Sequence, residues 1–255
     1  MVIKLYELVD FLNRYLDIDK FEEIDPIVNG LEIEGEYTVS KVATCVSITN
    51  SIIDEAVRGG INVLITHHGI ITRRNGVKRI VGSFKEKLRK ILMNNISVLA
   101  YHLPLDAHVE IGNNVSIAKV LNLNIIDWIY EKNIPIGVVA LCNNKVSIYD
   151  VYKEVKSKIN EKAILLKYGL DRVERIAIIS GAGAKFIKKF TKREVDLFMT
   201  GEFREDCEVY AIDEKINVIV MGHYASEVFG VRNLARLLRE KFNIETVFLR
   251  SEQII

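Results

Sequence analysis

The sequence predicts an α/β protein whose mostly parallel sheets are covered by helices. Apolar segments typical of strands alternate with amphipathic segments typical of helices. The predicted strands lack the apolar–polar alternation of a half-exposed sheet, which indicates strands buried on both faces. The second half of the 255-residue chain also repeats the pattern of the first, which indicates an internal duplication.

The first half contains the clearest elements. Residues 4–16 are predicted to form an amphipathic helix, because Leu5, Leu8 and Leu12 fall on one stripe. A strand is predicted over 41–48, and the Thr49-Asn50-Ser51 segment that follows supplies a helix N-cap. The remaining expected elements are a helix over about 51–58, a strand over 61–66, a helix over 83–94, a strand over 96–101, a helix over about 113–121 and a strand near 124–129.

The second half aligns with the first in two blocks. Residues 41–69 align without a gap with residues 175–203, and each block reads as a strand, a small-polar turn, a helix, a second strand and a Thr-led loop. We therefore favour a duplicated half over chance patterning of α/β units. The predicted domains are 1–128 and 129–255, and the C-terminal segment from about 216 could pack into the first domain.

The second block carries a repeated polar motif. Residues 95–106 align with residues 216–227. This alignment sets His102 against His223, and a carboxylate follows four residues after each of them. Asp106 in the first half thus corresponds to Glu227 in the second.

Composition bounds the function classes. The chain is 49% hydrophobic with a net charge of +1, which is typical of a globular protein and gives no bulk argument for nucleic acid or an anionic membrane as main partner. No apolar stretch approaches the roughly 18 residues of a membrane helix. Three widely spaced cysteines indicate reduced thiols in a cytoplasmic protein. Two basic clusters are predicted to be solvated, with a binding patch as the alternative: Arg73, Arg74, Lys78 and Arg79, and Lys185, Lys188, Lys189, Lys192 and Arg193.

Four of the five histidines follow apolar runs. Two of them are the adjacent pair His67-His68, and the others are His102 and His223. In open α/β folds, ligands gather at the carboxyl ends of the strands. Imidazoles and carboxylates collected there indicate a metal site, and their number indicates more than one ion.

Each candidate also has a structural alternative. His67-His68 is read as a ligand pair, because two successive buried histidines would each need partners for both ring nitrogens. Glu227 would share a helix face with His223 and could bridge two cations, or it could simply stabilise a helix N-terminus. Asp106 could be a ligand or a helix cap, and His102 a ligand or the residue that orients one. His108 is read as polar surface or site rim.

The predicted donors suit zinc, manganese, iron or nickel. Two such ions can activate a bridging water and clamp a phosphate or carbonyl oxygen, which is hydrolase chemistry. The segment from Ser180 to Ala184 follows a predicted strand, but it fails the dinucleotide-loop pattern because Phe186 stands at the third glycine position. We therefore read this segment as a tight strand-to-helix turn, with a turn whose backbone amides accept an anion as the alternative.

These residues together resemble the NIF-three-like proteins, often named GTP cyclohydrolase 1 type 2 homologues. The resemblance runs essentially end to end. It rests on Asn29-Gly30-Leu31, Ile65-Thr66-His67-His68-Gly69, His102-x-x-Leu105-Asp106, Ser180-Gly181-Ala182-Gly183, Thr200-Gly201-Glu202 and Gly222-His223-x-x-Ser226-Glu227.

The resemblance implies two interlinked α/β domains without an extra middle domain, a dinuclear metal centre between them, and toroidal homohexamers. It implies Asn29 near the site and Glu227 as the bridge between ions. The implied ligands are His67, His68, Asp106, His223 and Glu227. Two departures stand out: Glu32 replaces a common glutamine, and Asp206 stands about where many members carry a histidine.

Two functions follow from these observations. The first is a metal-dependent hydrolase of a nucleotide-like or other small phosphorylated or heterocyclic substrate, with two divalent ions per chain. In it, Glu227 and His102 are the catalytic residues, and His102 orients a ligand or shuttles a proton. The alternative is a non-catalytic metal-binding hexamer, a scaffold or metallochaperone that contacts protein or nucleic acid. A third reading, in which the histidines are structural and no metal binds, also stays open.

Overall fold

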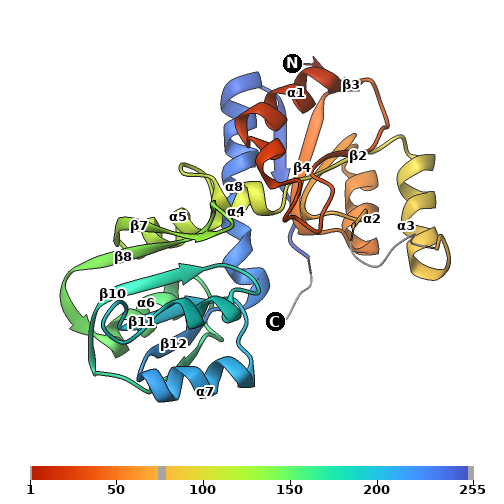
Figure 1. The fold of residues 1–255 in the computed structure, drawn as a ribbon. Coiled ribbons are helices and arrows are strands. Elements are labelled where there is room, and N and C mark those ends of the chain that lie inside the picture. The colour runs from red at the N-terminus through yellow and green to blue at the C-terminus, as the bar shows by residue number, and fades with distance from the viewer. Residues whose placement is uncertain (1, 74–78, 252–255) are drawn as a thin grey trace. The chain divides into compact units, whose positions relative to one another are not determined.

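The computed structural model describes residues 2–73 and 79–251, and these divide into two compact units. Unit 1 contains residues up to Leu105 and residues from Gly230 onward, and unit 2 contains Asp106–Phe229. Both units combine a sheet that contains parallel strands with covering helices, which confirms the predicted α/β class (Figure 1). Among the described residues, no helix has the length and apolar character needed to cross a membrane.

Unit 1 is built on a five-stranded sheet of order β13-β4-β5-β6-β2. The strands from β13 to β6 are parallel, and β2 is antiparallel to β6. Their bounds are β2 Gly30–Ile33, β4 Lys41–Ser47, β5 Val63–His68, β6 Ser97–Ala100 and β13 Glu245–Phe248. A separate pair joins β1 (Ile3–Lys4) to β3 (Thr38–Val39).

The helices of unit 1 follow their sequence signals. They are α1 (Leu5–Tyr15), α2 (Asn50–Arg58) and α3 (Gly82–Met93), with a short 3₁₀ segment η1 (Ile18–Phe21). Thr49 caps α2 by accepting a hydrogen bond from the Ile52 amide at 3.2 Å. Apolar residues of α2 and α3 pack against alternate residues of β4, β5 and β6 in one cluster, whose buried members are at most 6% exposed.

Unit 2 is built on a six-stranded sheet of order β7-β8-β10-β11-β12-β9. The three strands β10, β11 and β12 are parallel, and the outer three pair antiparallel. The bounds are β7 Asn124–Glu131, β8 Ile134–Ser147, β9 Ile164–Leu166, β10 Arg172–Ile179, β11 Leu197–Thr200 and β12 Asn217–Val220. Its helical segments are α4 Leu103–Ala107, which begins in unit 1, α5 Asn113–Val120, α6 Ile148–Lys158, η2 Ala184–Lys189 and α7 Glu205–Glu214.

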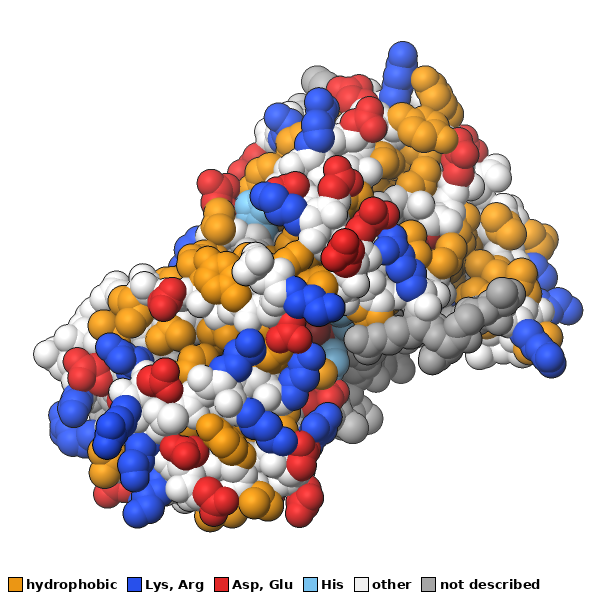
Figure 2. Space-filling view, viewed as in Figure 1, with side chains coloured by type: hydrophobic (Ala, Val, Ile, Leu, Met, Phe, Trp, Pro, Cys, Tyr) orange, Lys and Arg blue, Asp and Glu red, His pale blue; other side chains and the backbone are white. Residues whose placement is uncertain are grey.

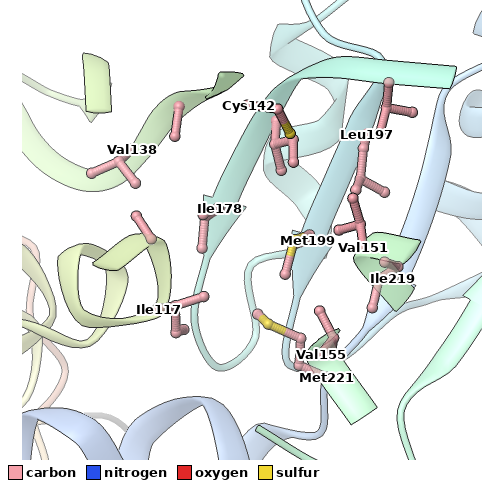
Figure 3. Close-up of a cluster of buried hydrophobic side chains, with 14 of the residues drawn as sticks. Ile117, Val138, Cys142, Val151, Val155, Ile178, Leu197, Met199, Ile219 and Met221 are labelled. Atoms are coloured by element: carbon pink, nitrogen blue, oxygen red, sulfur yellow. The ribbon is translucent and has the colours of Figure 1, made fainter. Parts of the chain in front are cut away.

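Both faces of the unit 2 sheet are buried, as the continuous apolar strands predict. On one face, Ile176 and Ile178 of β10 join residues of α5 and α6 (Figure 3). On the other face, Ala177 and Ile179 of the same strand join residues of η2 and α7. Alternate side chains of one strand therefore enter two separate cores.

The strand register tests the proposed repeat. Val42 pairs with Val63 in unit 1, and Ile176 pairs with Leu197 in unit 2, which are the same positions in the gap-free alignment. The next strand departs from it: Leu197 pairs with Asn217, whereas the alignment would set it beside Val218. The alignment of residues 95–106 with residues 216–227 is therefore shifted by one residue from the correspondence that the strand pairing gives.

This shift separates two histidines that the alignment had equated. The amide of Tyr101 donates to Thr66, and the amide of Met221 donates to Thr200 in the corresponding place of unit 2. Because Tyr101 thus corresponds to Met221, the structural equivalent of His102 in unit 2 is Gly222. His223 comes one residue later, as the first residue of α8 (His223–Phe242), where the sequence placed a helix start.

One predicted α-helix is replaced by a shorter element. The block alignment predicted a helix after the turn that begins at Ser180, but the chain there forms the 3₁₀ segment η2. This segment is six residues long, and its buried residues are Ala184 and Ile187, three apart, which are eclipsed in a 3₁₀ helix.

Candidate metal centre

Three histidines of unit 1 form one cluster. His67 and His68 are the last two residues of β5, and His102 follows the neighbouring parallel strand β6. The ring centroid of His67 lies 4.8 Å from that of His68 and 4.9 Å from that of His102. The centroids of His68 and His102 are 5.7 Å apart. One possible donor atom of each residue lies within 4.8 Å of the other two, so this group could hold a metal ion.

The two histidines of β5 are each anchored through Nδ1. Nδ1 of His67 lies 3.1 Å from the carbonyl oxygen of Tyr101, and Nδ1 of His68 lies 2.8 Å from the hydroxyl of Ser47. In metal sites, a ligating histidine commonly makes such a bond through its second ring nitrogen, which fixes the ring's tautomer and orientation. The donor that each of these rings would offer a cation is therefore Nε2.

Asp25 anchors the third histidine in the same way. Its Oδ1 lies 2.8 Å from Nδ1 of His102, and its other contacts are the amides of Ile27 and Leu103 and the side-chain amide of Asn29, each at 2.9 Å. Burial alone would raise the pKa of Asp25, but the hydrogen bonds outweigh it and hold that pKa below its ordinary value. The sequence reasoning missed Asp25, whereas Asn29 lies beside His102, as expected.

In unit 2, His223 lies between two carboxylates. Its Nδ1 is 2.5 Å from Oε1 of Glu202, and its Nε2 is 3.1 Å from Oε1 of Glu227, one turn further along α8. Burial acts to lower the pKa of His223, but Glu227 and then Glu202 favour the charged form and raise that pKa to about 9. The sequence motif contained Glu202, but its role as a partner of His223 was not foreseen.

The small-residue turn after β10 makes room for Glu227. Gly181 has a φ of +57°, and a Cβ atom there would collide with Oε1 of Glu227. Ser226 holds this turn, since its hydroxyl accepts from the Gly181 amide at 3.0 Å and donates to the carbonyl of His223 at 2.8 Å. Ser226 and Gly181, which come from two different sequence motifs, thus together shape the surroundings of Glu227 in unit 2.

Asp106 is held by a buried polar network in the same unit. Its Oδ1 accepts from the side-chain amide of Asn113 at 2.8 Å and from the hydroxyl of Ser180 at 2.9 Å. Asn114 joins the network by donating to the backbone carbonyl of Asp106 and accepting from the amide of Ser180. These contacts set the direction of the carboxylate, and sequence spacing gave no sign of the two asparagines.

The two departures from the family pattern have local partners. The carboxylate of Glu32 accepts from the amides of Ile70 and Ile71, both at 2.9 Å, and so supports the loop after His68. Asp206 is paired with Arg204 and Lys188 at 2.9 Å each, and these cations hold its pKa well below the ordinary value.

On the face of the molecule that Figure 2 shows, lysine and arginine side chains are interspersed with acidic side chains. Lys185 and Lys189 each lie 3.7 Å from Glu131, and Arg73 lies 3.3 Å from Glu22. Arg74 and Lys78 fall outside the described residues. His108 accepts from the backbone amides of Glu110 and Ile111 and thereby caps a turn.

The residues present fit a divalent metal. Unit 1 supplies clustered imidazoles anchored through Nδ1, and unit 2 supplies an imidazole with buried carboxylates. This is the nitrogen–oxygen donor chemistry of zinc, iron, manganese or nickel sites, without a thiolate. Because Gly181 has no Cβ, its backbone can lie close to the Glu227 carboxylate.

Comparison with known proteins gives one consistent family. The family model described as Duf34/NIF3 (NGG1p interacting factor 3) matches residues 3–254. A Pyrococcus abyssi protein named GTP cyclohydrolase 1 type 2 homolog is 34% identical over 247 residues, 96% of this chain and 97% of its own. A protein of the same name from Archaeoglobus fulgidus is 35% identical over 248 residues, 97% and 98% of the two chains.

Solved structures agree with the sequence relatives. The structure of the protein ybgI, described as of unknown function, has a TM-score of 0.92 and 30% identity, over 98% of this chain and 99% of that one. The crystal structure of TTHA1606 from Thermus thermophilus has a TM-score of 0.88 and 32% identity, over 99% and 100%.

Proposed function

Because the chain belongs to the Duf34/NIF3 family, we propose that it is a metal-dependent hydrolase with two divalent ions per chain. The substrate would be nucleotide-like or another small phosphorylated or heterocyclic compound, and the ions zinc, manganese, iron or nickel. The residues proposed to hold the ions are His67, His68, Asp106, His223 and Glu227.

The observation that carries this proposal is the shared anchoring of the imidazoles. Four histidines, spread over both units, each bond through Nδ1 to a partner outside the ring, as ligating histidines commonly do. This leaves Nε2 of each of the four rings as the nitrogen that would meet a cation.

The chain's own residues would prepare the site. Glu202 would hold His223 so that Nε2 meets the ion, while Asn113 and Ser180 would hold Asp106 through one oxygen. When bound, the ions would supply Lewis acidity and a nucleophile from water at neutral pH. The catalytic assignment of Glu227 and His102 stays a prediction.

The relatives' name suggests GTP ring opening as one reaction of this class, and we include it as a candidate. The experiment is turnover of a nucleotide panel that contains GTP by metal-reconstituted protein and by Glu227→Ala. We expect activity in the unmodified protein and in an exposed control variant, and none in Glu227→Ala. The exposed Glu194→Ala serves as control, because Glu194 bonds only to Thr191 in the described contacts. Equal turnover by all three proteins would refute the proposed mechanism.

The predicted homohexamer and cytoplasmic location are kept as part of the proposal. Light scattering on purified protein tests the assembly, with six times the 29.1 kDa chain mass as the expected result. A monomer at micromolar concentration would contradict it.

A further inference from the structure

We infer that unit 2 contains a binding pocket for a small organic ammonium ion with an apolar body. The pocket has a volume of about 230 Å³ and is lined by residues of β8, of α6 and of the turn that joins α5 to β7. None of its lining residues belongs to the proposed metal centre. The inference is therefore independent of the proposed hydrolase function.

An irregularity in β8 lies at the centre of this pocket. β8 pairs with β10 at Leu141 and again at Val146, and between these two pairs a single residue of β10 stands opposite residues 142–145. On its other side, β8 pairs with β7 only up to Leu141, where β7 begins. Bulges of this kind occur next to functional sites, because they bend the strand and redirect its side chains. Residues 142–145 thus leave the regular sheet at the place where the pocket lies.

The inner part of the pocket is apolar. Cys142 and Val151 are 8% and 7% exposed, and both belong to the buried cluster that Figure 3 shows. Leu121, Leu123 and Val146 pack against the same cluster and also line the pocket. A mostly apolar lining with a few polar groups is typical of small-molecule sites, and drug-sized ligands occupy roughly 300–1,000 Å³. The smaller volume here predicts a compact ligand.

The thiol of Cys142 adds apolar surface to the pocket and no charge. Burial raises the pKa of this thiol, and the negative charges of Glu174 and Asp196 raise it further. The thiol is therefore protonated at neutral pH, and a protonated cysteine packs like a small hydrophobic side chain. A preference of the pocket for ligand charge must come from its exposed residues.

The exposed lining residues supply a negative charge. Asp150 and Glu154 lie one turn apart on α6, and the residues that line the pocket include no lysine, arginine or histidine. Glu154 is paired with Lys158 at 2.7 Å, whereas Asp150 has no ion-pair partner in the described part of the chain. One uncompensated carboxylate thus borders an apolar cavity. This arrangement is complementary to an ammonium group on an apolar body.

Three probes of similar size test the charge preference. They are benzylammonium, benzyl alcohol and benzoate, which share a ring and differ in charge. Each is added to full-length protein during labelling with a small uncharged methanethiosulfonate, and mass spectrometry follows the label on each cysteine. Cys142 reports the pocket because it lines it, whereas Cys45 and Cys207 have no exposed surface and report unfolding. Saturation-transfer NMR of the same probes gives a second measurement that does not depend on the thiol.

We expect millimolar benzylammonium to slow the labelling of Cys142 by at least about threefold, and the other two probes to slow it less. Asp150→Asn should remove most of this protection, and Glu154→Gln should weaken it because Lys158 loses its partner. Asp213→Asn, an exposed position on α7, is the matched control and should be protected like the unmodified protein. Slow labelling of Cys45 and Cys207 confirms that a variant is folded, and Glu154→Gln decides if Asp150→Asn is not.

Two results would count against the inference. Equal protection by all three probes, or stronger protection by benzoate, would overturn the assignment of an ammonium ligand. No protection and no saturation transfer with any probe would show that the cavity is not a binding site for compounds of this size. Neither result bears on the proposed metal function, because labelling of Cys142 requires no metal.

Discussion

Oε1 of Glu202 lies 2.5 Å from Nδ1 of His223, so a carboxylate outside the predicted ligand set holds the only histidine that unit 2 contributes to that set. We expect Glu202→Gln to weaken metal binding by about 10- to 100-fold, because carboxylate partners orient ligating histidines and raise their basicity. Competition with a zinc chelator measures this loss. Glu205→Gln, an exposed neighbour at the start of α7, should bind zinc like the unmodified protein.

Metal uptake should also release a proton. In the metal-free protein the pKa of His223 is about 9, so the ring is protonated at pH 7.5. Coordination through Nε2 requires the neutral ring, and apparent affinity should therefore rise with pH until about 9. Calorimetry at pH 7.5 in buffers of different ionisation enthalpy counts the protons. Uptake with no proton released would show that His223 is not a ligand.

Gly181 provides a test of the space beside Glu227. Its φ of +57° makes Gly181→Ala cost about 1 kcal/mol in conformation alone, and the added Cβ would also push against Glu227. The matched control is Gly60→Ala, where φ is +63° and no atom lies within 4 Å of the added Cβ. We expect both variants to lose stability in urea unfolding, and only Gly181→Ala to lose metal affinity. Equal metal affinity of the two variants would show that metal binding does not depend on the space between Gly181 and Glu227.

Glu32→Gln tests the departure from the common family residue. Both oxygens of Glu32 accept backbone amides, and a glutamine would turn an NH₂ group toward one of them. Because the site is partly exposed, we expect a loss of about 1 kcal/mol in the free energy of unfolding. The exposed Glu240→Gln should leave stability unchanged. A stable Glu32→Gln variant would mean that the loop after His68 does not depend on the carboxylate.

The sequence pattern predicted those helices and strands whose formation depends on residues within or next to the element itself. The helix after Thr49 has its cap in the adjacent residue, and the strands before His68 and Tyr101 are continuous apolar runs. The helix expected after Ser180 failed because the repeat was assumed to extend to every element. The one-residue shift at Asn217 had no sequence signal, because strand register depends on pairing between distant segments.

Only the part of the candidate site that lies at strand ends was predictable from the sequence. Apolar runs that end in histidine identified the cluster of His67, His68 and His102, since strand ends meet at one sheet edge. Asp25 reaches His102 from a loop without periodic pattern, and Asn113 reaches Asp106 from a helix start. Such long-range hydrogen bonds leave no spacing rule in the chain, so only the fold revealed them.

The most direct test of the account is the metal content of protein purified without chelator or an affinity-tag metal. Elemental analysis should find two divalent ions per chain, or restore that number when metal-stripped protein is supplied with zinc, manganese, iron or nickel. Less than one ion per chain, with no uptake on resupply, would contradict the proposed metal centre and leave the clustered histidines as structural residues.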